Sequence, residues 1–124
     1  MIENVQELGV IKISDEVVAT AAGIAAMQVP GVHGLYGTLR EGLAELIGKK
    51  AATRGITVQM GEDSVALSLS IEVEFGVRIQ DVAWKVQQGV KRRVEEMTGL
   101  MVREVNVNVQ GVSTPKPQKE KSSI

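Results

Sequence analysis

The chain has 124 residues, which is the size of one domain and long enough to bury a hydrophobic core without disulfide bonds or a structural metal. Its 14 basic and 15 acidic residues leave a net charge of −1, so no overall positive field attracts nucleic acid or anionic lipid. Cysteine does not occur, which excludes disulfide bonds and thiolate metal sites and suits a reducing cytoplasm. We therefore expect one soluble domain located in the cytoplasm.

The N-terminal part of the sequence predicts a short strand followed by a helix. Gly9–Ile13 predicts the first strand, which lies at an edge of the sheet or leads into it. Ser14 stands where a helix N-cap belongs, and the carboxylates of Asp15 and Glu16 complement the dipole of the first turn. The uncharged run at residues 17–32 is too short and too rich in alanine to span a membrane, so we expect no direct membrane insertion.

One face of this first helix carries only small side chains and no charge. A helix without a polar face is usually buried on all sides, and small side chains allow another backbone to approach closely. The favoured interpretation is that the second long helix of the same domain covers this face. The alternative is a surface for self-association. The residues concerned are Ala19, Ala22, Gly23 and Ala26.

The first helix should end at Pro30 and Gly31, since proline cannot continue a helix. Residues 32–36 then predict a short strand or turn. Thr38–Gly48 opens with a capping box and continues with leucines at helical spacing, which predicts a short amphipathic helix.

Residues 65–75 show the longest alternation of apolar and polar side chains in the chain, which is typical of a half-buried strand. Residues 54–60 alternate in the same way, and the turn at 61–63 joins the two segments into an antiparallel hairpin. We expect the rest of the fold to be organised around the longer strand. Its apolar face consists of Val65, Leu67, Leu69, Ile71, Val73 and Phe75.

From residue 77 the apolar period changes from two to 3.6, which predicts a second long helix that ends at Gly99. Residues 102–112 alternate again and predict the last strand, with Val105, Val107 and Val109 inward. The apolar stripe of the helix is expected to consist of Ile79, Val82, Ala83, Val86, Val90, Val94 and Met97.

Together these elements predict an α+β domain, a two-layer sandwich in which two long helices pack on one face of a small mixed sheet. The expected order is strand, helix, strand, short helix, two hairpin strands, helix and strand. Residues 1–8 should form a lead-in that lacks the features of a signal peptide, residues 9–112 the single domain, and residues 113–124 a flexible tail. The other sheet face displays polar side chains, among them Ser68 and Ser70, and is a candidate docking surface.

Trp84 is the only tryptophan and lies off the apolar stripe of its helix, beside polar side chains. Either the ring folds over the helix flank onto a neighbouring element, or it anchors a protein partner, as exposed tryptophans often do. An RNA platform on the sheet is disfavoured because no aromatic residue occupies the outward positions of the predicted strands.

Two glycine-containing motifs match nucleotide-binding or nucleic-acid-binding loops only superficially. Gly42–Lys50 lacks the glycine spacing and the Ser/Thr of a phosphate-binding loop. Gly34–Gly37 has the GXXG pattern of KH domains, but its middle residues are leucine and tyrosine instead of basic residues, so turn glycines are favoured. His33 is the only histidine, which favours a structural role over acid–base chemistry.

The charged residues do not suggest a catalytic centre. Glu72 and Glu74 share the polar sheet face, where no apolar pocket is expected to raise the pKa of a general acid. The basic cluster at residues 91–93 is expected to be a solvated helix face with ion pairs at helical spacing. We therefore expect no catalytic residue, metal, cofactor or small-molecule substrate. The expected ion pairs are Asp81 with Lys85 and Lys91 with Glu95.

Motifs in both halves of the chain resemble those of a known bacterial family. In the first half they are GVIKISDEVV at 9–18, AAGIAA at 21–26 and VPGV at 29–32. In the second half they are FGVRI at 75–79, VEEMTGL at 94–100 and VNVNVQGV at 105–112. These stretches are similar to the alkaline-shock-protein family, also called the Gls family, of envelope-stress proteins.

This resemblance implies a non-enzymatic scaffold or adaptor of envelope stress or homeostasis, which acts through protein contacts and self-association. Some relatives assemble beneath the membrane through a membrane-anchored partner, and others are associated with fatty-acid or acetyl-CoA metabolism, so a regulator of that metabolism is an alternative. The rival from another class is a small KH-like nucleic-acid-binding module, motivated by Gly34–Gly37, Lys49, Lys50 and the basic tail. Binding to nucleic acid is nevertheless expected to be absent.

Overall fold

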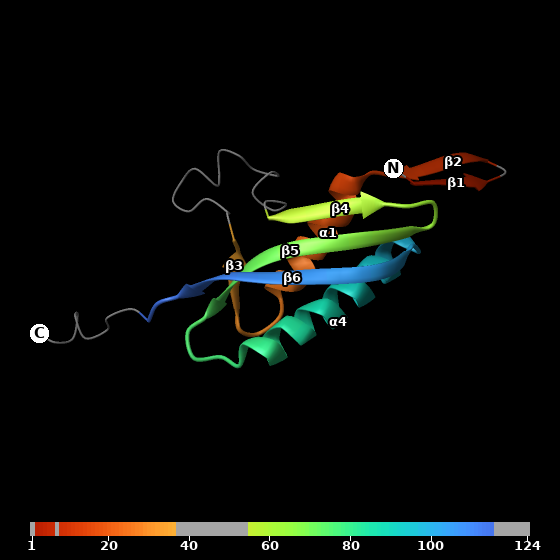
Figure 1. Ribbon diagram of the computed structural model, residues 1–124. Coiled ribbons are helices and arrows are strands. Elements are labelled where there is room, and N and C mark those ends of the chain that lie inside the picture. The colour runs from red at the N-terminus through yellow and green to blue at the C-terminus, as the bar shows by residue number, and fades with distance from the viewer. Residues whose placement is uncertain (1, 7, 37–54, 116–124) are drawn as a thin grey trace, which may run out of the picture.

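The longest strand, β5 (Ser64–Glu74), runs through the middle of the sheet, and the other three strands of that sheet all pair with it (Figure 1). β6 (Met101–Ser113) lies parallel along one edge of β5 over its whole length. β4 (Ile56–Met60) and β3 (Val32–Leu35) pair antiparallel with β5 and share its other edge. The computed structural model describes residues 2–6, 8–36 and 55–115.

Two helices, α1 (Asp15–Met27) and α4 (Ile79–Thr98), cover the same face of this sheet (Figure 1). The expected α+β sandwich, with two long helices on one face of a mixed sheet, is therefore confirmed. The predicted start of the first helix and the predicted end of the second are also confirmed. The Ser14 hydroxyl accepts a hydrogen bond of 3.3 Å from the backbone N–H of Val17, and Gly99 closes α4 in a left-handed conformation with φ 77°.

The core follows the alternation of β5. Its five inward side chains are at most 1% exposed, and the valines of α4 that lie above them recur every four residues. The parallel ladder shifts register between Val65 and Ala66 and again between Ile71 and Glu72, so β6 keeps its valines on the helical side. The innermost residues are Val65, Leu67, Leu69, Ile71 and Val73 of β5, Val86, Val90 and Val94 of α4, and Val18 of α1.

Three residues that were expected in the core are exposed instead. β5 ends at Glu74, so Phe75 lies in the turn before α4 and is 67% exposed. Ile79 begins α4 ahead of Val82, the first buried residue of the helix, and Met97 near its other end lies toward the outer side of α1. The apolar stripe of α4 is therefore narrower and shorter than predicted.

The N-terminal segment differs from its prediction. β1 (Ile2–Gln6) lies inside the expected lead-in and pairs antiparallel with β2 (Gly9–Ile13). The two strands form a separate two-stranded sheet that projects from one end of the domain (Figure 1). β2 is therefore not an edge strand of the main sheet, because its ladder partner is the preceding segment.

The remaining boundaries agree with the predictions to within two residues. β4 begins at Ile56, and β6 ends at Ser113, which is the first residue of the expected tail. The predicted helix at Thr38–Gly48 and the tail beyond residue 115 lie outside the described residues.

The turn between α1 and β3 requires glycine at position 31. Gly31 has φ 100°, and a Cβ atom built there would lie 2.7 Å from Cγ2 of Val82 in α4. α1 itself ends at Met27 with Gln28 as its C-cap, and Gly31 lets the turn that follows approach the start of α4.

Three hydrogen bonds that involve Lys91, Glu95 and Val102 join α4 to the start of β6. The carboxylate of Glu95 accepts hydrogen bonds from Lys91 Nζ at 2.8 Å and from the backbone N–H of Val102 at 3.0 Å. Lys91 Nζ also donates to the carbonyl of Val102 at 3.3 Å. The hydrogen bond from Lys91, followed by that from Val102, lowers the pKa of Glu95 below its ordinary value.

Val86 tests the placement of α4 on the sheet. Because its side chain is fully buried, Val86→Asp places an unpaired carboxylate in the core, and we expect the cooperative thermal unfolding transition to be lost. The exposed Gln88→Asp on the same helix is the control and should melt close to the parent. Unfolding is monitored by circular dichroism. A cooperative transition of Val86→Asp at a temperature near that of the parent would refute this packing.

Glu95 predicts a dependence of stability on pH. A carboxyl whose pKa is lowered on folding stabilises the native state above the unfolded pKa, and this contribution disappears as the pH falls through the folded pKa. Glu95→Gln should therefore unfold at lower urea concentration than the parent near neutral pH. The two proteins should converge at a pH well below 4.5, the ordinary value for this group. An equal difference at both pH values would contradict the role of the carboxylate.

Candidate interaction surface

The small-residue face of α1 is buried inside the domain. Ala22 and Ala26 have no exposed surface, and Ala19 and Gly23 are also buried. α1 packs against α4, β3 and β4, so this face is covered by other elements of the same domain. The prediction that Ala19, Ala22, Gly23 and Ala26 form a surface for self-association is therefore wrong, and the favoured alternative of intradomain packing is confirmed.

Larger apolar side chains lie on the outer side of the helices instead. Val17 and Ile24 of α1 are 48% and 50% exposed, and Met97 of α4 is 60% exposed. With Thr20 and Ala21 they line a shallow hollow of about 390 Å³ whose margins carry Glu16 and Arg93. We call the three exposed residues Val17, Ile24 and Met97 the apolar patch.

Sequence reasoning missed the apolar patch because it assigned Met97 to the core. The size of the side chains on the first helix could have indicated the patch. Two helices that share one face of a narrow sheet approach closely only where small side chains lie between them, so the larger side chains lie on the outer face of the helix.

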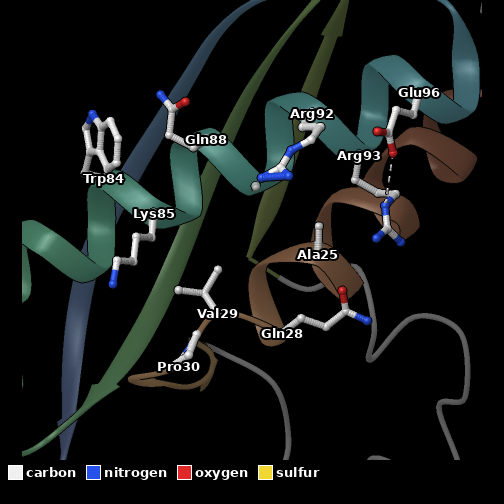
Figure 2. A pocket seen from close by; sticks show the side chains of 11 residues that line it. Ala25, Gln28, Val29, Pro30, Trp84, Lys85, Gln88, Arg92, Arg93 and Glu96 are labelled. Carbon is white, nitrogen blue, oxygen red and sulfur yellow. Dashed lines mark ion pairs between the residues drawn. The ribbon is translucent and has the colours of Figure 1, made fainter.

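A second hollow, of about 600 Å³, lies between the C-terminal end of α1 and the middle of α4 (Figure 2). Its apolar part comes from the turn after α1, and most of its polar and aromatic part comes from α4. We call it the basic groove, and define it by Val29, Pro30, Trp84, Lys85, Gln88, Arg92 and Arg93.

The basic groove carries more positive charge than the sequence suggested. Of the two expected ion pairs, that between Lys91 and Glu95 is confirmed, but Asp81 pairs with Arg78 at 3.0 Å. Lys85 and Arg92 make no ion pair within the described parts of the chain. The helix face is solvated and carries ion pairs at helical spacing, as expected, but the predicted pair of Asp81 with Lys85 is wrong.

Trp84 lies at one end of the basic groove and is 58% exposed. Figure 2 shows its ring projecting from α4 on the same side as Gln88, while Lys85 extends toward the turn that carries Val29 and Pro30. More than half of the surface of this residue is thus accessible to another molecule, and its role as a partner anchor stays a prediction.

The open face of the sheet is polar, as expected. Ser68 and Ser70 are half-buried among their neighbours, and the Ser68 hydroxyl accepts a long hydrogen bond of 3.4 Å from the Asn108 side chain. These polar groups pair along and across the strands. Their use as a docking surface stays a prediction.

One aromatic side chain on this face was not anticipated. A Cβ atom built on Gly111 would lie 3.1 Å from Cγ of Glu72 and 3.3 Å from Cδ1 of Tyr36. Both side chains therefore lie over the backbone of β6 at Gly111 on the open face. The expectation that no aromatic residue lies there is wrong, because the irregular pairing at His33 changes which side chains of this segment face outward.

The glycine motifs and the titratable residues form no assembled site within the described residues. Gly34 and Leu35 belong to β3, and Leu35 is buried in the core, so they do not form a loop between two helices as the GXXG of a KH domain does. His33 is exposed on the same strand. Among the residues that the structure describes, no three acidic or histidine side chains gather into a potential metal site. Gly42–Lys50 lies outside them.

Neither helix in the described ranges combines the length and the apolar character needed to cross a membrane.

Comparison with known families gives a match over nearly the whole chain. Residues 3–114 match the alkaline shock protein 23 family, which is described as having a cell envelope-related function. Among similar proteins, YloU of Bacillus subtilis is 36% identical over 118 residues, which cover 94% of this chain and 98% of YloU. YqhY of the same organism is 34% identical over 105 residues, which cover 85% of this chain and 78% of YqhY.

A protein named as a stress response regulator gls24 homolog, from Streptococcus pyogenes, is 29% identical over 107 residues, which cover 86% of this chain and 60% of that protein. The copper form of a MamM CTD variant, a solved structure, is similar with a TM-score of 0.51 and 15% identity. It covers 82% of this chain and 100% of the other. At this identity the likeness concerns the fold alone.

Proposed function

Because the chain belongs to the alkaline shock protein 23 family, with its cell envelope-related function, we propose that it is a non-enzymatic scaffold or adaptor of envelope stress or homeostasis. In this role it acts through protein contacts and through self-association. The similarity to a protein named as a stress response regulator supports the link to stress.

The apolar patch is the observation that carries this proposal. Full burial of a Val, Ile or Met side chain contributes about 1.5–3 kcal/mol, so covering the exposed half of three such residues contributes roughly 3 kcal/mol per copy and roughly 6 kcal/mol in a two-fold dimer. Association itself costs about 4–15 kcal/mol. The apolar patch alone therefore supports only weak, concentration-dependent self-association.

The projecting β1–β2 hairpin supplies further apolar surface. Leu8, Val10 and Ile11 are all at least half exposed. An isolated two-stranded hairpin is marginally stable in water, so contact with a second copy would stabilise it as well as bury these side chains. We infer that the self-association interface includes both the apolar patch and this hairpin.

Charge at the margins of the apolar patch favours a second copy of the same chain. A two-fold interface places each surface against itself, so it needs complementary charges on either side of its axis. Glu16 of α1 and Arg93 of α4, which carry opposite charges, line the same hollow as the patch. In a two-fold dimer, Glu16 of one copy can therefore approach Arg93 of the other.

The family's envelope-related function supports a location in the cytoplasm close to the membrane, where a membrane-anchored protein partner holds the assembly. High local concentration beneath a membrane would also favour a weak self-association. A crosslinking pull-down from stressed and unstressed cells tests this part of the proposal.

Ile24→Lys tests the role of the apolar patch. A charge at this half-exposed position leaves the core unchanged but prevents close apolar contact, so sedimentation velocity should show the variant as monomer at concentrations where the parent associates. The matched control is Phe75→Lys, which alters an exposed apolar side chain in the turn before α4. A parent that stays monomeric at high concentration, together with no envelope partner in the pull-down, would contradict the scaffold proposal.

A charge swap tests the two-fold arrangement. Glu16→Arg and Arg93→Glu should each weaken self-association, because each places like charges across the interface, and the double variant should restore it. The measurement is the dimer dissociation constant from sedimentation equilibrium. A double variant as weak as the two single variants would exclude this pairing.

A further inference from the structure

We propose that the basic groove binds a short acidic segment of a partner protein, with an apolar side chain of that segment resting against Trp84. This inference rests on the adaptor role and deepens it by naming the chemistry of the partner. The groove is centred on α4 and the end of α1, and it meets the proposed self-association surface at Arg93, which lines both hollows.

The charge of the basic groove favours an anionic occupant. Lys85 and Arg92 have no carboxylate partner among the described residues, and Arg93 is held by Glu96 only loosely, at 3.8 Å between Nε and Oε1. The groove thus lines up three basic side chains against one carboxylate. Figure 2 shows Arg92 directed along the groove between Trp84 and the ion pair of Arg93.

The apolar part of the basic groove indicates that the occupant is more than a simple anion. Val29 and Pro30 line it from the turn after α1, and the exposed Trp84 lines it from α4. A tryptophan that is more than half exposed beside basic side chains offers apolar contact and charge in one place. An acidic peptide with an aliphatic or aromatic residue matches both features.

The length of the basic groove fits a short segment. Trp84 and Glu96 lie on the same helix, and at about 1.5 Å per residue their separation is roughly 18 Å. An extended peptide rises about 3.3 Å per residue, so about five or six residues fill this length. The occupant is thus the size of a short linear motif.

Acidic side chains at both ends disfavour a long polyanion. Asp81 lies one helical turn before Trp84, and Glu96 closes the other end of the groove. A long nucleic acid that continued past both ends would meet both carboxylates, whereas a peptide of five or six residues reaches only Glu96, which is already paired with Arg93. The chain's own C-terminal tail does not complement the groove, because its charged residues are mostly lysine.

The single tryptophan gives a direct test, since all tryptophan emission of the full chain reports on the groove. The probe is a fluorescein-labelled short peptide that alternates glutamate and leucine, and binding is followed by label anisotropy and by Trp84 emission. We expect saturable binding at low ionic strength that weakens as salt is added. A peptide with lysine in place of glutamate should not bind.

Three variants locate the binding. Arg92→Glu should weaken the affinity by about tenfold or more, the loss expected for a close charge pair. Trp84→Ala should lower the affinity measured by anisotropy. The charge-matched control Arg103→Glu on β6 should have an affinity within about twofold of that of the parent. All three sites are exposed, so the fold should persist by circular dichroism.

Several results would overturn the proposal. One is the absence of saturable binding of the acidic peptide at low salt. Another is a loss of affinity in Arg103→Glu equal to that in Arg92→Glu, and a third is a single-stranded oligonucleotide of similar length that binds more tightly than the peptide. A shift of Trp84 emission on self-association alone would assign the groove to a second copy. Ile24→Lys separates the two proposals, because a monomeric variant that still binds the peptide retains the groove without the self-association surface.

Discussion

The fold depends on the complete burial of one face of β5 combined with pairing along both of its edges. Its inward side chains alternate strictly and are almost fully buried, so a slip of one residue would turn the whole apolar set toward solvent. β6 fixes one edge, and β4 and β3 share the other. The helices, the turns and both candidate surfaces take their positions from this strand.

Parallel pairing of β5 with β6 requires a long crossover, and α4 provides it. Its four buried valines face the sheet, which leaves the opposite side of the helix to charged residues and Trp84. α1 fits beside α4 because its inward residues are alanine and glycine, and this close approach turns Val17 and Ile24 outward. The basic groove and the apolar patch therefore both follow from how closely two helices share one face of a narrow sheet.

Elements with a strong period of their own could be predicted from the sequence. The alternation of β5, the valine repeat of α4, the Ser14 cap and the Gly99 end all depend on residues that are near in the chain. Features that depend on distant residues were missed. The ladder partner of β2 is a segment with little periodicity, and the position of Tyr36 over Gly111 follows from irregular strand pairing. The basic groove needs α1 and α4 side by side, and the identity of Trp84 alone did not reveal it.

Arg93 connects the two proposed surfaces, because it borders both the apolar patch and the basic groove. In the single chain it is paired loosely with Glu96. A second copy that brought Glu16 toward Arg93 would draw this side chain out of the groove and leave the Glu96 carboxylate there without its partner. The groove would then be less attractive to an acidic segment. By thermodynamic reciprocity, an acidic partner that held Arg93 in the groove would weaken self-association to the same extent. Under the two proposals, the protein therefore exchanges contacts with its own copies for contacts with a partner, and one side chain mediates the exchange.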